Sequence, residues 1–98
     1  MRVSWSERAR TQAREIFEYI AQDRPLAAER LLDGFVERTS LLADLPEQGA
    51  PWGRPHRSDL RAIVYESYRI VYRIGSDEVA ILSVRHTRMD RDTPSGEP

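Results

Sequence analysis

The stretch that decides the fold reads YRIVYRIGSDEVAILSVRHTRMD and spans residues 68–90. In residues 68–74, aromatic and aliphatic side chains alternate with two arginines and a valine, which is the period-2 pattern of a strand with one apolar and one partly charged face. Gly75-Ser76-Asp77 supplies turn residues, and residues 79–84 then predict a second, mostly apolar strand. We therefore expect a β-hairpin that carries Arg69 and Arg73 on its polar face.

The hairpin runs directly into a basic segment that contains Arg85, His86, Arg88 and Arg91. Clustered arginines near a chain end commonly meet an acidic partner, and a solvated surface is the alternative. Residues 92–98 have the composition of a flexible tail. The basic segment at residues 85–91 is where the sequence first points to function.

Upstream, the pattern changes to the helical period. Residues 1–5 predict a short strand, Ser6 a helix cap, and residues 9–20 an amphipathic helix with charged residues on its other side. The sequence Asp-Arg-Pro at 23–25 predicts the end of this helix and the start of another, with the aspartate as cap and proline in the first turn. Apolar residues within 28–42 continue at helical spacing, so we expect an antiparallel helical hairpin.

A loop rich in glycine and proline follows at 47–58 and contains Trp52, which we expect to plug the edge of the core, with a waiting partner surface as the alternative. Residues 60–65 predict a further strand. The element order is then strand, helix, helix, strand, strand, strand. This order predicts an α+β fold within residues 1–91, a single domain in which the helical hairpin packs on one face of a mainly antiparallel sheet.

Composition narrows the function classes. The chain has 98 residues, 40% hydrophobic and 32% charged, which suits one globular domain. No window approaches the roughly 20 apolar residues of a membrane span, and the amino terminus lacks a signal-peptide core, so we expect a cytoplasmic protein without a membrane partner. With no cysteine and only two isolated histidines, we expect no metal site. We also expect no cofactor and no small-molecule substrate.

The charge is distributed unevenly. The net charge is only -1, which argues against a general polyanion binder. Residues 1–53 carry seven arginines and nine acids, residues 54–91 carry eight arginines and five acids, and residues 92–98 add two acids. All 15 basic residues are arginine, so the chain can bind carboxylate or phosphate through two hydrogen bonds but has no lysine for acid–base catalysis.

The element order and particular residues together resemble the RelE/ParE superfamily of bacterial toxins, which belong to type II toxin–antitoxin systems. The resemblance covers nearly the whole chain. It is carried by WSERAR at 5–10, REIFEYIAQDRP at 14–25, LPEQG at 45–49, LRAI at 60–63, YRIVYRI at 68–74 and ILSVRHTRMD at 81–90.

The resemblance implies one of two activities, because RelE-like proteins cleave mRNA on the ribosome whereas ParE-like proteins are associated with inhibition of DNA gyrase. Such a nuclease needs a base, an acid and cations for the phosphorane-like charge. Arg69 and His86 match residues of RelE-like enzymes and would be the catalytic pair. The chain has no lysine, however, and Thr87 stands where those enzymes carry a tyrosine. We therefore favour the ParE-like branch and a gyrase inhibitor that is not an enzyme.

The resemblance also implies partners and candidate contacts. The partners are a cognate antitoxin and gyrase, with the ribosome and mRNA as the alternative target; a degenerate, non-toxic module that only binds an antitoxin is the third interpretation. The expected target-binding residues are Arg61, Arg69, Arg73, Arg85, His86 and Arg88. The expected antitoxin-binding residues are Arg8, Arg10 and Arg14.

Each candidate has an ordinary structural alternative. Arg69 and Arg73 could pair across strands, for example with Glu78, Arg61 could be tied to the preceding loop, and His86 could be structural. For the three tyrosines of the strands we favour packing between sheet and helices over stacking on bases, because they have the spacing of a core face. These tyrosines are Tyr65, Tyr68 and Tyr72.

Overall fold

The structure is a computed structural model that describes residues 1–53 and 59–90. The predicted order of strands and helices is confirmed, and four short elements are added to it. Arg91 and the tail at 92–98 lie outside the described residues. The elements are β1 (Arg2–Trp5), α1 (Glu7–Ala21), α2 (Pro25–Ser40), the 3-10 helices η1 (Leu41–Ala43) and η2 (Pro46–Gln48), β2 (Ala50–Pro51), β3 (Leu60–Tyr65), β4 (Tyr68–Ile74), β5 (Glu78–His86) and α3 (Thr87–Asp90).

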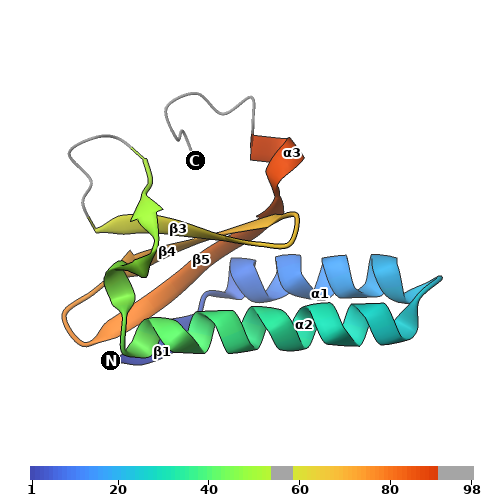
Figure 1. Cartoon of the computed structure of the whole chain (residues 1–98), viewed down its shortest axis with the longest axis horizontal. Coiled ribbons are helices and arrows are strands. Elements are labelled where there is room, and N and C mark those ends of the chain that lie inside the picture. Colours follow the sequence, from blue (N-terminus) through green and yellow to red (C-terminus); the bar gives the residue numbers. More distant parts are fainter. Residues whose placement is uncertain (54–58, 91–98) are drawn as a thin grey trace.

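The strands form one sheet in the order β1-β5-β4-β3-β2. All neighbouring pairs are antiparallel except β1 and β5, which run parallel. Helices α1 and α2 lie side by side and cover one face of this sheet, whereas α3 lies on the other side (Figure 1). The predicted two-layer α+β fold is therefore confirmed.

The two long helices begin differently. Ser6 caps α1 as predicted, with its Oγ accepting a hydrogen bond from the Ala9 N–H at 3.0 Å. The predicted aspartate cap of α2 is wrong: Arg24 occupies the cap position and makes no side-chain capping bond, because Pro25 takes the first helical position and Asp23 lies one residue too early. The second helix ends at Ser40, and the two short 3-10 helices η1 and η2 follow it.

The face of the sheet that α1 and α2 cover is called here the helix-covered face, and it holds the core. Ile70 and Tyr72 of β4 are fully buried. Tyr65 and Tyr68 pack edge-to-face on Phe35 of α2, with ring centroids 6.0 and 5.5 Å away. The prediction that the three strand tyrosines pack against the helices is confirmed.

A β-bulge interrupts β5 opposite the middle of β4. Val71 pairs with Ser83, but the next residue of β4, Tyr72, pairs with Ile81, so Leu82 is one extra residue in β5. Ile81 and Val84 are consequently both buried although they are three residues apart. The bulge reverses the alternation beyond it, which decides the directions of the last two residues of the strand.

Candidate functional site

Arg69 and Arg85 meet on the face of the sheet turned away from α1 and α2, called here the outer face. They are directly opposite each other on β4 and β5, next to the pair Tyr68 and His86 that faces the helices. Like charges at directly opposed strand positions repel each other. The register therefore concentrates positive charge at one place on the outer face.

Trp52 packs against Arg69, one member of this arginine pair. The guanidinium carbon of Arg69 lies 4.9 Å from the centroid of the Trp52 ring, within the range of a cation–π contact. The Trp52 N–H donates to the Leu60 carbonyl at 2.9 Å, which holds the residue at the end of β2 beside β3. The tryptophan is outside the core cluster, so the prediction that it plugs the core edge is wrong.

Arg73 also lies on the outer face, at the other end of β4, and is exposed. The expected partner Glu78 is bound instead by Arg2, with Nη2 to Oε1 at 2.8 Å. Hydrogen bonds from Arg2 and from Ser4 hold the pKa of Glu78 below its ordinary value, and the Arg73 charge adds a smaller effect. Arg73 thus acts on this carboxylate through space only.

Arg61 is on the other side of the sheet, opposite Tyr72. Its Nη1 donates to the carbonyl oxygens of Gly49 at 2.7 Å and Glu47 at 3.3 Å. The Tyr72 hydroxyl donates to the Pro46 carbonyl and accepts from the Gly49 N–H. These bonds tie down the loop after α2 and support the structural alternative for Arg61.

His86 is separated from the arginine pair by the sheet. It pairs with Tyr68 on the helix-covered side, where the two rings meet edge-to-face at 5.3 Å. Its Nδ1 accepts a hydrogen bond from the Arg88 N–H at 3.1 Å, at the start of α3. Arg61 and His86 thus lie on the helix-covered side, and the exposed Arg88 belongs to α3. The six expected target-binding residues therefore do not form one surface, because the other three are arginines of the outer face.

The three arginines expected to bind the antitoxin are exposed on α1, and two of them line an apolar groove of about 400 Å³. Arg10 donates from Nη1 to the Trp5 carbonyl at 2.6 Å, while Arg8 lies outside the groove lining. This groove was not predicted from the sequence; the one signal for it was Val36, an apolar residue that lies off the predicted buried stripe of the second helix. The groove is lined by Trp5, Arg10, Ala13, Arg14, Phe17, Leu32 and Val36.

Comparison with known proteins gives a direct family assignment. The model of the family described as ParE toxin of type II toxin-antitoxin system, parDE, matches residues 3–91. The chain belongs to the ParE toxin family. This toxin is also similar to the putative toxin Y4kP of Sinorhizobium fredii, with 36% identity over 85 residues that cover 87% of this chain and 86% of the relative.

Two solved toxin–antitoxin structures share the toxin's fold. One is described as the chromosomal ParDE system from P. aeruginosa; it matches with a TM-score of 0.72 at 22% identity, over 88% of this chain and 95% of that chain. The other is the RelBE2 toxin–antitoxin complex from Mycobacterium tuberculosis, with a TM-score of 0.65 at 26% identity, over 87% of this chain and 95% of that chain. The RelE/ParE fold expected from the sequence is thereby confirmed.

Within residues 1–53 and 59–90, no group of three or more potential ligand side chains could hold a metal ion. In the same part of the toxin, no helix is both long and apolar enough to cross a membrane. The outer face carries the guanidinium groups of Arg69, Arg73 and Arg85, and Trp52 packs on the first of them. Guanidinium groups bind anions and pack on aromatic rings.

Proposed function

We propose that this toxin arrests growth in the cytoplasm by inhibiting DNA gyrase, and that it contacts its target through the outer face. The observation that supports this most is the directly opposed pair Arg69 and Arg85, with Trp52 packed on Arg69. Two adjacent guanidinium groups suit an acidic protein surface or a phosphate backbone. Arg73 and Arg88 would extend the contact at its margins.

The separation of Arg69 from His86 supports inhibition by binding over RNA cleavage. A nuclease that uses these two residues needs both of them at one phosphate, with the base within hydrogen-bond reach of the proton it removes. Their side chains instead leave the sheet on opposite faces. The arginines on the strands of the outer face can stabilise negative charge but do not act as a general base. The carboxylate of Glu78, on the same face, could act as one, but it is already bound by Arg2.

A supercoiling assay with purified gyrase tests the proposal. We expect the toxin to inhibit supercoiling and to trap a cleavage complex, and Arg69→Gln or Arg85→Gln to weaken inhibition about tenfold or more, as loss of a charged hydrogen-bonding group does. Arg30→Gln, an exposed arginine of α2, is the matched control and should inhibit like the parent. Full supercoiling activity in the presence of the parent toxin would contradict the proposal.

A ribosome-dependent mRNA endonuclease is the second candidate, supported by the similarity to the RelBE2 structure. Primer extension on transcripts from induced cells distinguishes the two. We expect no toxin-dependent cleavage, and we expect His86→Ala to arrest growth as the parent does. Transcript cleavage that His86→Ala abolishes would favour the nuclease, and expression without growth arrest would favour the non-toxic antitoxin-binding module.

We also infer that an antitoxin occupies the apolar groove lined by Trp5, Phe17 and Val36. An amphipathic helix with acidic flanks fits this site, because Arg10 and Arg14 lie at the rim of an apolar floor. Arg14→Gln should slow association and flatten its dependence on salt, whereas Phe17→Ala should speed dissociation. Arg30→Gln again serves as the control, and equal effects of both arginine variants would argue against this groove.

A further inference from the structure

The helix layer leaves a cleft at one end of the sheet that neither target nor antitoxin binding explains. It lies where the connection between α1 and α2 passes over the turn from β3 to β4, and its volume is about 500 Å³. This volume is within the range of small-molecule sites. The cleft is lined by Tyr19, Ile20, Asp23, Arg24, Ala27, Arg30, Leu31, Tyr65, Glu66, Ser67, Tyr68 and His86.

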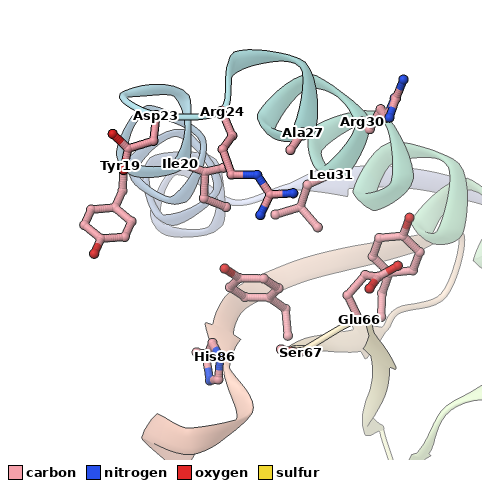
Figure 2. Close-up of a pocket in the computed structure, with 12 residues that line it drawn as sticks. Tyr19, Ile20, Asp23, Arg24, Ala27, Arg30, Leu31, Glu66, Ser67 and His86 are labelled. Carbon is pink, nitrogen blue, oxygen red and sulfur yellow. The ribbon is translucent and has the colours of Figure 1, made fainter.

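Three side-chain groups that can donate a hydrogen bond line this cleft, one each from Arg24, Tyr68 and His86. The Arg24 side chain extends from the helix connection into the space between helices and sheet, and His86 lies at the opposite mouth (Figure 2). In the described part of the chain, no hydrogen bond or ion pair is formed by the Arg24 guanidinium, the Tyr68 hydroxyl or Nε2 of His86. Burial raises the pKa of Tyr68, so its hydroxyl remains a donor at neutral pH.

Apolar and aromatic side chains form another part of the lining. Ile20 and Leu31 project from the helices into the cleft (Figure 2). Tyr19 is 76% exposed, so its ring offers a flat face at the rim. Aromatic side chains of this kind stack on nucleobases, and a guanidinium binds a phosphate with two hydrogen bonds.

We propose that this cleft binds a nucleoside monophosphate, either free or as the 5′ end of a nucleic acid strand. The phosphate lies between Arg24 and His86, and the base packs against Tyr68 and Tyr19. Asp23 and Glu66 at the rim repel additional negative charge, which favours one phosphate over three. This inference does not depend on gyrase being the target.

Titrations of the purified full chain by NMR and calorimetry test the proposal. Adenosine 5′-monophosphate and a 5′-phosphorylated oligonucleotide are the main probes; adenosine, inorganic phosphate and adenosine triphosphate separate the contributions of base and charge. We expect saturable shifts at Tyr68 and His86, tighter binding of the monophosphate than of the triphosphate, and weaker binding of adenosine or phosphate alone. Saturation by the oligonucleotide but not by the free nucleotide also supports the site and identifies a strand end as the ligand.

Matched variants separate a built site from general attraction. Arg24→Gln should weaken binding about tenfold or more. Arg30→Gln should not, because Arg30 lines the same cleft but its guanidinium points away from it (Figure 2). Tyr68→Phe keeps the ring and the packing on Phe35 and should weaken binding less. Equal effects of the two arginine variants, or no saturable binding of either main probe, would overturn the proposal.

Discussion

The two faces of β4 differ sharply in burial and charge. Ile70 and Tyr72 are fully buried under the helices, whereas Arg69 and Arg73, their neighbours in sequence, lie on the outer face. One strand of seven residues therefore contributes both to the core and to a cationic surface. Substitutions in this one strand can therefore change the packing of the core and the charge of the outer face separately.

The largest expected difference in stability is between alanine substitutions of two adjacent residues that lie on different faces of β4. Ile70→Ala should lower the free energy of unfolding by about 2–5 kcal/mol, because it leaves a cavity in the core. Val71 lies half-buried on the outer face, so Val71→Ala should lower the free energy of unfolding by only about 1 kcal/mol. Urea denaturation of both variants measures the difference, and equal losses would show that the outer face is as well packed as the core.

Removing one hydroxyl from the helix-covered face should have the next largest effect. Tyr72→Phe removes the donor to the Pro46 carbonyl and the acceptor for the buried Gly49 N–H. Leaving such groups unpaired should lower the free energy of unfolding by about 1–3 kcal/mol. Tyr19→Phe is the control, since that residue is exposed. Matching midpoints for the two variants in thermal unfolding would argue against the hydrogen-bonded loop.

A smaller loss should follow from adding one methyl group between α2 and β3. The ring of Tyr65 lies directly on Gly34, where an added Cβ would overlap it. Overpacking of about 1–3 kcal/mol should exceed the gain of about 1 kcal/mol from the better helix propensity of alanine. Gly34→Ala should therefore destabilise the parent but stabilise a Tyr65→Ala background. A loss of equal size in both backgrounds, measured by denaturation, would contradict this contact.

The smallest effect should be a pH dependence that originates outside the core. Bonds from Arg2 and Ser4 lower the pKa of Glu78 from its ordinary 4.5, so the unfolded chain takes up this proton more readily than the folded one. The resulting stability is complete above pH 4.5 and is lost as the pH falls through the lower folded value. Glu78→Gln and Arg2→Gln should each reduce the slope of stability against pH in this acid range. An unchanged slope would show that the ion pair does not contribute.

Simple periodicity was sufficient to predict much of this arrangement. Alternation along residues 68–74 placed the tyrosines and isoleucines in the core and Arg69 and Arg73 on the opposite face, as observed. The helical spacing of apolar residues predicted α1, and Ser6 predicted where it begins, because serine is strongly preferred as the cap before a helix. These signals are local, so neighbouring residues suffice to show them.

The features that were not predicted depend on distant residues. A bulge leaves no mark in composition, so the directions of Arg85 and His86 could not be obtained from alternation alone. The position of Trp52 depends on β3 and on Arg69, which lies 17 places further along the chain. The expected target-binding residues therefore come from both faces of the sheet, because the sequence shows their chemistry but not their side of the sheet.

The position of β5 between β1 and β4 also has a consequence for biosynthesis. The first strand of the chain pairs with the last one, Arg2 opposite Glu78, so two of the partners that close the sheet leave the ribosome at opposite ends of translation. Contacts so far apart in sequence form slowly and only after most of the chain is available. A nascent polypeptide that has not reached β5 thus lacks the strand that joins β1 to β4, and the sheet closes only after β5 has been synthesised.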